Sequence, residues 1–273
     1  MKTRKTATVL VWICVIAFSL ITLFPFYVMI IMSTHVSEDI TRSLKLLPGN
    51  YLMKNLESVF KTDFIRFYLN SAYTSILATV GGVLVSSLAG FAFAKYRFKG
   101  RRVLFGIVLA TLMIPTQLGL VGMVMQLKSM GLMNTHFALI VPPMANAFYV
   151  FWMTQYMRSS VPTEILESAR MDGCGDLRVF FTIVFPIIRP ATITVFLLAF
   201  LGSWNNYLTP LIVLTKEKLY TIPMAVTLFS TTYRNDYAAS ITALTLATIP
   251  IIIMFSFGSK YLVKGMTAGS VKG

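Results

Sequence analysis

The stretch VLVWICVIAFSLITLFPFYVMIIM (9–32) decides the fold class, because it is apolar over its whole length and contains no Asp, Glu, Lys or Arg. A helix needs about 20 mostly apolar residues to cross the hydrocarbon core of a bilayer. The Leu, Ile, Val and Phe residues within 9–28 together contribute roughly −4 to −8 kcal/mol to insertion. The stretch therefore predicts a transmembrane helix.

A cleaved signal peptide is the alternative interpretation of this first stretch. Lys2, Arg4 and Lys5 precede it, as in a charged leader. However, the apolar stretch is longer than a signal core, and no small-residue cleavage site follows Met32. We therefore expect a helix that is retained in the mature protein.

The composition of the whole chain agrees with a membrane protein. The 273 residues are 56% hydrophobic and 12% charged, whereas an ordinary globular domain is about 45–50% apolar and about 25% charged. The mean hydropathy is +0.73. These values exclude a soluble enzyme, a disordered protein and a disulfide scaffold. Cys14 and Cys174 are expected at different depths and hence as free thiols.

Five further stretches are long and apolar enough to span a bilayer: 69–94, 103–126, 135–157, 187–210 and 241–259. None of them contains Asp, Glu or Lys. Lone prolines such as Pro25 and Pro115 are expected to be tolerated in such helices. The sequence therefore predicts an all-α membrane protein with six transmembrane helices, folded as a single domain over 1–273.

The basic residues orient these spans. Of the 24 Lys and Arg residues, 15 fall on the side that holds both termini. The densest cluster is KYRFKGRR (95–102), which lies between two close spans, where the positive-inside rule has most force. Both termini are therefore expected in the cytoplasm. The net charge of +14 is explained by orientation, and a nucleic-acid partner is not expected.

No catalytic or energy-coupling motif is visible in the chain. The sequence lacks a G-x-x-x-x-G-K-[ST] phosphate loop and an H-E-x-x-H metal motif, and its two histidines, His35 and His136, are far apart. No ionisable residue is expected at mid-membrane depth, where proton-driven carriers keep relay groups. We therefore expect no catalytic residues, no metal ligands and an energy source outside the bilayer.

The cytoplasmic loop 158–186 is much longer than a connection between neighbouring helices requires. Thr163 can cap a short helix whose first turn carries Glu164. Gly173 suits the left-handed position at the end of that helix, and Asp176 can cap the next one. The loop therefore predicts a short helix over 163–173.

The predicted helix carries an apolar stripe of Ile165, Leu166 and Ala169. Such an amphipathic helix can insert into the groove of another protein. A helix that rests on the lipid headgroups is an equally good interpretation of amphipathicity alone.

This loop carries a resemblance to a known family. The segments ESARMDG (167–173) and IVFP (183–186) resemble the E-A-A…G…I-x-L-P signature of permease subunits of bacterial ABC importers. The matching positions are Glu167, Ala169, Gly173, Ile183 and Pro186, while Ser168 and Phe185 are mild departures. The resemblance implies that helix 163–173 couples the chain to an ATPase subunit. It implies Glu167 as a polar contact, Ala169 as a close-packing position and Gly173 as a turn.

Two further segments narrow the resemblance to carbohydrate importers. SWNNYLTPLI (203–212) is similar to the W-N-x-[FY]-x-x-P-L segment of carbohydrate-uptake permeases. The tail KYLVKGMTAGSVKG (260–273) resembles the C-terminus of one partner type in the maltose and multiple-sugar importers. In such systems the tail approaches the ATPase interface.

The resemblance implies a type I ABC importer permease fold in the bacterial cytoplasmic (inner) membrane. The expected partners are a second permease subunit, two ATPase subunits and an extracytoplasmic solute-binding protein. The chain itself is expected to bind no cofactor, since the ATPase subunits use the ATP. The solute is left open between an oligosaccharide, a monosaccharide and a glycerol phosphate. The alternatives are a self-contained secondary carrier or channel and an intramembrane enzyme.

Trp204, Asn205, Asn206 and Tyr207 are possible substrate-path residues, because rings stack on the apolar faces of sugars and amides bond their hydroxyls. They are equally compatible with an outer aromatic belt. Weaker pore candidates are Gln117, Gln126, Asn146 and Tyr149. A stripe of small residues at 78, 82, 86, 90 and 94 favours a helix-packing face over the alternative, a lining of the translocation path. Of the outer loops, 33–68 and 211–240, the second is expected to contact the binding protein.

Overall fold

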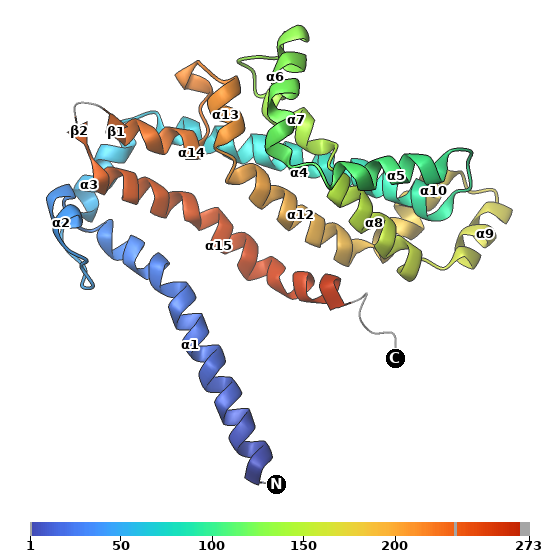
Figure 1. Cartoon of the computed structure of the whole chain (residues 1–273), viewed down its shortest axis with the longest axis horizontal. Coiled ribbons are helices and arrows are strands. Elements are labelled where there is room, and N and C mark those ends of the chain that lie inside the picture. Colours follow the sequence, from blue (N-terminus) through green and yellow to red (C-terminus); the bar gives the residue numbers. More distant parts are fainter. Residues whose placement is uncertain (1, 232–233, 268–273) are drawn as a thin grey trace. The chain divides into compact units, whose positions relative to one another are not determined.

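The computed structural model describes residues 2–231 and 234–267, and most of them are helical (Figure 1). The last residues of the predicted 260–273 tail, 268–273, lie outside the described residues. The chain divides into two compact units. Unit 1 covers the described parts of Met1–Ile65 and Ala225–Ile249, and unit 2 those of Arg66–Met224 and Pro250–Gly273. The expectation of a single domain stays a prediction.

Unit 1 begins with the long helix α1. Its elements are α1 (Lys2–Met32), α2 (Ser37–Arg42), α3 (Leu52–Phe60), η4 (Val226–Phe229), β1 (Ser230–Thr231), β2 (Arg234–Asn235) and the first part of α15 (Tyr237–Thr267). α1 continues through Pro25, as expected. In the most apolar window of Thr8–Met32 none of the residues is buried. A helix that is apolar on all sides and uncovered by its own chain suits a lipid environment.

Polar contacts fix the loop that follows α1. The Asn55 side-chain amide donates to the backbone carbonyls of Ser33 and His35, both at 2.8 Å. The Ser37 hydroxyl donates to Asp236 Oδ1 at 3.0 Å and accepts from the Ala238 N–H at 3.1 Å. These bonds hold the segment after α1 against α3 and the start of α15.

Unit 2 contains most of the other helices. They are α4 (Phe64–Lys95), α5 (Arg101–Thr111), η1 (Thr116–Gly119), α6 (Leu120–Ser129), α7 (Phe137–Met144), α8 (Ala147–Ser160), α9 (Thr163–Met171), α10 (Asp176–Val179), η2 (Phe180–Val184), α11 (Phe185–Ile187), α12 (Arg189–Trp204), α13 (Leu208–Val213), η3 (Glu217–Leu219) and α14 (Ile222–Ala225). α12 packs against α7 and α8, and α8 packs against α5. The main core lies among α4, α8, α9, α10, η2 and α12, around Met153, Phe180 and Val195.

Around Ser86 and Gly90 the small-residue stripe on α4 is a packing face, as predicted. Ser86 is fully buried. A Cβ atom added at Gly90 would lie 2.8 Å from Met153 Cβ and 3.0 Å from the Thr154 nitrogen. The absence of a side chain at Gly90 therefore lets α4 lie directly against the backbone of α8.

The third predicted span, 103–126, is wrong as a single helix. α5 ends at Thr111, and the helix that resumes at Thr116 is bent from it by 101°. Pro115 lies at the break and is extended, with ψ of 127°. Its ring prevents the preceding residue from continuing a helix, so tolerance of this proline was the wrong expectation.

The fifth predicted span, 187–210, is found as α12 (Arg189–Trp204); a bend of the chain lies at its start, and the helix stops before its predicted end. Asp176–Ile187 and Arg189–Trp204 are bent from each other by 83°. The second helix ends at Trp204, and residues 208–213 form the separate helix α13. Pro190, at the second position of α12, cannot donate a hydrogen bond to the preceding turn, and the chain bends beside it.

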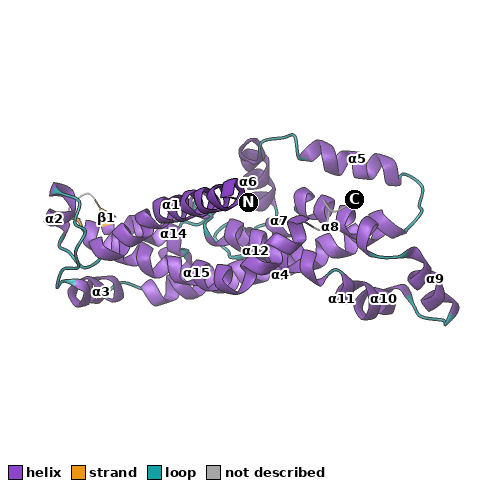
Figure 2. Ribbon diagram, turned by 90° about the horizontal axis from the view of Figure 1, so that it is seen from below, coloured by secondary structure: helices purple, strands orange, loops and turns teal. Residues whose placement is uncertain are grey.

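The remaining spans are found as expected. Phe64–Lys95, Phe137–Ser160 and Tyr237–Tyr261 are each long and apolar enough to cross a membrane, as is Thr8–Met32. Among the described residues these four helices give four candidate spans, and counting each of the two bent pairs as one span gives up to six, by length and composition. The protein is thus an all-helical, multi-pass membrane protein apart from the two-residue strands β1 and β2 (Figure 2).

Candidate functional site

The cytoplasmic loop forms the predicted short helix, α9, and stops it at the predicted glycine. Gly173 has a φ of 78°, the left-handed region that favours glycine. Its N–H donates to the Arg170 carbonyl, and the Cys174 N–H donates to the Ala169 carbonyl, both at 3.0 Å. This pair of bonds is a Schellman motif, which satisfies carbonyls that the end of a helix leaves free. α9 lies at one end of unit 2, beyond α10 and α11 (Figure 2).

Both predicted N-caps in this loop are wrong. Pro162 occupies the N-cap position of α9, so Thr163 is the first helical residue. Gly175 occupies that position before α10. Asp176 instead accepts on Oδ1 from the Arg170 guanidinium, from Nη2 at 3.1 Å and from Nε at 3.2 Å. We expected this carboxylate to accept from backbone N–H groups at the start of α10. It pairs with Arg170 instead, because a charged guanidinium binds a carboxylate more strongly than a backbone N–H does.

The inner face of α9 packs against its own chain. Leu166 is 1% exposed and Ala169 is 7% exposed, and both belong to the main core of unit 2. Ile165, the third member of the predicted stripe, is 43% exposed. Packing within the chain thus explains the amphipathicity, which sequence reasoning assigned to a partner or to the headgroups. Glu167 and Ser168 lie on the exposed outer face.

Arg170 links α9 to the end of α4. Its guanidinium lies over the ring of Tyr96, 5.0 Å from the ring centroid. A hydrogen bond with Tyr96 is the main cause that raises the pKa of Arg170, with further contributions from Asp176. Lys95 donates to the Val161 carbonyl at the other end of the loop. The sequence did not predict the contacts of Arg170 with Tyr96 or of Lys95 with Val161, because only the fold brings the basic segment 95–102 beside α9.

Ile183 and Pro186 lie beyond this short helix. Ile183 is half-buried in the π-helical turn η2 and packs against the main core. Pro186 is exposed in α11. These two positions of the signature therefore belong to the bent segment that leads into α12, while Glu167, Ser168, Ala169 and Gly173 belong to α9 and its turn.

A second feature of unit 2 is a cavity of about 520 Å³ among α4, η1, α6, α7, α8, α12 and α13. Its polar lining residues are Thr116, Gln117, Asn146, Tyr149, Ser203, Asn206 and Thr209. The mixture of amides, hydroxyls and apolar side chains resembles the lining of small-molecule sites. Gln117, Asn146 and Tyr149 were the weaker predictions, and sequence periodicity alone did not group them because Gln117 lies in η1 whereas Asn146 and Tyr149 lie at the start of α8.

Of the four favoured substrate-path residues, only Asn206 lines this cavity. Its amide also accepts from the Thr209 N–H and donates to the Thr209 hydroxyl, both at 3.1 Å. Asn205 and Tyr207 are exposed, and neither lines the cavity. The weaker candidate Gln126 is exposed on α6 and does not line it either.

Trp204 faces a different environment. It is 3% exposed, stacks on Phe200 with ring centroids 5.5 Å apart, and meets the ring of Tyr68 edge-on at 5.5 Å. These three rings line an apolar pocket of about 370 Å³ beside Pro250 and Met254. The ring stacking predicted for a sugar is therefore used within the chain.

The segment 218–222 of the second outer loop is anchored on α4 and on His136, which precedes α7. Asn70 donates to the carbonyls of Lys218 and Tyr220, at 2.9 and 3.0 Å. The Ser71 hydroxyl accepts from the Ile222 N–H at 2.7 Å. His136 Nε2 lies 2.8 Å from the Leu219 carbonyl oxygen, and Nδ1 of the same ring contacts the Tyr73 hydroxyl. These bonds hold the segment 218–222 against α4 within unit 2.

Within residues 2–231 and 234–267, no group of three or more His, Cys, Asp and Glu residues is placed to hold a metal ion. Cys14 and Cys174 are free thiols.

Comparison with known proteins adds three findings. Residues 82–268 match the family described as "Binding-protein-dependent transport system inner membrane component". The chain is 33% identical to the arabinooligosaccharides transport system permease protein AraQ of Halalkalibacterium halodurans, over 99% of each chain. It is 34% identical to the lactose transport system permease protein LacG of Rhizobium radiobacter, over 92% of each chain.

A solved structure shares the fold. A chain of a bacterial ABC transporter involved in the import of the acidic polysaccharide alginate superposes with a TM-score of 0.82 at 22% identity. The match covers 96% of this chain and 98% of that chain. At this identity the likeness shows a common fold.

Proposed function

The chain belongs to the family of binding-protein-dependent transport system inner membrane components, and we propose that it forms half of the translocation path of a carbohydrate ABC importer. It is a multi-pass permease subunit of the inner membrane, and the distribution of its basic residues supports placing both termini in the cytoplasm. The proposal adds the solute class, the partners and the residues that carry the coupling.

The solute class rests on the relatives. Two relatives above 30% identity are named for arabinooligosaccharides and for lactose, and each is matched over nearly its whole length. The cavity lined by Gln117, Asn146 and Asn206 fits this class, because amides bond sugar hydroxyls without imposing a charge. A second permease subunit would supply the other half of the path.

The exposed outer face of α9 is the observation that carries the coupling role. Leu166 and Ala169 are packed into the core of unit 2, so a push on α9 is transmitted to the helices behind it. Glu167 and Ser168 on the outer face are free to contact an ATPase subunit. The left-handed Gly173 and the contact of Arg170 with Tyr96 hold the helix in place.

The proposed partners follow from this arrangement. Two ATPase subunits bind ATP and close, and their motion drives α9 as a rigid body. The chain itself makes and breaks no bonds and binds no cofactor in this scheme. A solute-binding protein delivers the sugar to the outer side, where the segment 218–222 is held by Asn70 and His136.

Reconstitution tests the proposal. The chain, its partner permease, the ATPase pair and the binding protein are incorporated into vesicles, and uptake of a radiolabelled oligosaccharide is measured with and without ATP. We expect uptake only with ATP and with every subunit present. Replacement of Glu167 by Ala should lower uptake about tenfold or more, the effect of losing roughly 1.4 kcal/mol at an interface. Uptake by the isolated chain would favour the secondary carrier instead.

A further inference from the structure

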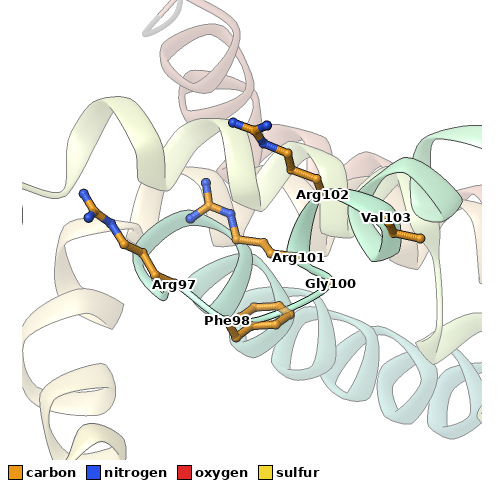
Figure 3. Close-up of a pocket in the computed structure, with 6 residues that line it drawn as sticks. All are labelled: Arg97, Phe98, Gly100, Arg101, Arg102 and Val103. Atoms are coloured by element: carbon orange, nitrogen blue, oxygen red, sulfur yellow. The ribbon is translucent and has the colours of Figure 1, made fainter.

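The short segment that joins α4 to α5 surrounds an open cavity of about 460 Å³ with arginine side chains. The lining residues are Arg97, Phe98, Gly100, Arg101, Arg102 and Val103. Figure 3 shows the three guanidinium groups extending to the same side of the segment. Gly100 has a φ of 83° and turns the chain so that Arg101 and Arg102 begin α5 beside Arg97.

These positive charges have little compensation from the described residues. None of the three arginines takes part in an ion pair there, and Arg97 and Arg102 make no hydrogen bond to the described residues. Arg101 donates once, from Nη1 to the Tyr96 carbonyl at 2.8 Å. Three neighbouring guanidinium groups repel one another, and their unused donors match the oxygens of a phosphate group.

The neighbouring surface is apolar and exposed. Val103, Leu104 and Ile107 follow the arginines on α5 and are 67%, 49% and 55% exposed. Phe98, within the segment, is also exposed. In a membrane helix such side chains face acyl chains, and the arginines then lie at the level of the headgroups. A ligand with a phosphate at one end and hydrocarbon at the other satisfies both parts of this surface.

We propose that the segment 97–107 binds the headgroup of an anionic phospholipid of the cytoplasmic leaflet, with Arg97, Arg101 and Arg102 around the phosphate and the exposed face of α5 against an acyl chain. Basic clusters next to transmembrane helices attract anionic lipids. Arginines that only orient the spans by the positive-inside rule need no contact with a particular lipid. Selective binding of one lipid class therefore distinguishes a lipid site from a role in orientation alone.

The site is tested on the full-length chain purified in mild detergent. A phosphatidylglycerol with a photoreactive acyl chain is crosslinked to it, with phosphatidylcholine of the same chain as the comparison probe, and the labelled peptides are mapped. The test variant is R97Q/R102Q, which removes the two arginines that bond nothing in the described residues and leaves Lys95, Lys99 and Arg101 to orient the spans. The matched control is R178Q/K260Q, which removes the same charge from the same side of the membrane.

We expect phosphatidylglycerol, and not phosphatidylcholine, to label residues 97–107. The R97Q/R102Q variant should lose about tenfold or more of this labelling, since each basic residue contributes roughly a fivefold factor, and the control should keep it. Equal labelling by the two lipids, or labelling that both variants retain, would overturn the proposal. Displacement of the lipid by millimolar inorganic phosphate would instead assign the arginines to a free anion. Crosslinking of residue 97 to an ATPase subunit in the assembled transporter would assign them to that protein.

Discussion

Arg170 and Asp176 face each other across the Gly173 turn, with Nη2 of the guanidinium 3.1 Å from Oδ1 of the carboxylate. Both side chains are partly exposed, so the pair contributes about 0–1 kcal/mol to stability. Its importance lies in position, because the same guanidinium lies over the ring of Tyr96. The pair thus fixes where α9 ends relative to α4 and α10.

The Gly173 turn gives the first prediction. Gly173→Ala forces an L side chain into the left-handed region, which costs roughly 1–2 kcal/mol, and the end of α9 should be displaced. We expect lower ATP-dependent sugar uptake by the reconstituted importer, together with weaker stimulation of its ATPase by loaded binding protein.

Gly175 provides the control for this substitution. Like Gly173 it has open space around its missing Cβ atom, but its φ is −66°. Gly175→Ala should leave uptake nearly unchanged, and Gly173→Asn should restore part of it, because Asn tolerates the left-handed region. Equal losses in the two alanine variants would show that the conformation at Gly173 is not what matters.

The sequence predicts much of this loop correctly, because its signals are local. Glycine at the end of a helix and an apolar spacing within a helix depend on neighbouring residues only. The partner of Asp176 and the packing of Leu166 were not predictable in this way. The packing of Leu166 depends on residues of α4, α8 and α12 that are far away in the sequence. Arg170 is only six residues from Asp176, but the Gly173 turn has to bring the two side chains together before they can pair.

The membrane spans show the same division. Apolar length located four spans, and six if each bent pair counts as one, but the bend of 101° within the predicted span 103–126 was missed. Pro115 is visible in the sequence, but we expected the helix to continue through it. For the cavity, the family segment 203–212 pointed to Trp204, whose ring packs within the chain, while Gln117 and Asn146 had only their polarity to mark them.

The cavity gives the second prediction. Gln117→Ala removes an amide that lines it, so the apparent KM for sugar uptake should rise about five- to tenfold, the effect of losing a hydrogen bond of roughly 1 kcal/mol. Gln126→Ala is the matched control, because Gln126 lies on α6 and does not line the cavity. Uptake kinetics in vesicles measure both. An unchanged KM in the Gln117 variant would remove this residue from the path.

The anchored outer loop gives the third prediction. Asn70 is 8% exposed and donates to two carbonyls of the loop. Asn70→Ala should leave both carbonyls without a donor, at a cost of about 1–3 kcal/mol, and release the segment 218–222. Stimulation of the ATPase by loaded binding protein should fall, while the basal rate stays the same.

Charge reversal probes the same surface without loosening it. Lys216 and Lys218 are exposed in the loop, and the K216E/K218E variant should also weaken the stimulation. If stimulation stays normal in this variant and in Asn70→Ala, the binding protein docks elsewhere.

The packing of α4 on α8 gives the fourth prediction. Gly90→Ala places a Cβ atom 2.8 Å from Met153 Cβ, and such overpacking costs about 1–3 kcal/mol. The thermal unfolding midpoint of the purified chain should fall. Gly106→Ala, on the open side of α5 with nothing within 4 Å, should leave the midpoint unchanged or slightly higher. A midpoint that Gly90→Ala does not lower would mean that the two helices do not pack this closely.

Site-specific photocrosslinking at position 167 in the assembled transporter tests the central claim most directly. A photoreactive amino acid replaces Glu167 on the outer face of α9, and the same amino acid replaces exposed Lys216 in the outer loop as the comparison. We expect position 167 to crosslink to an ATPase subunit and position 216 to crosslink to none. A crosslink from position 167 to the solute-binding protein, or its labelling by a membrane-impermeant reagent added outside intact cells, would contradict the account.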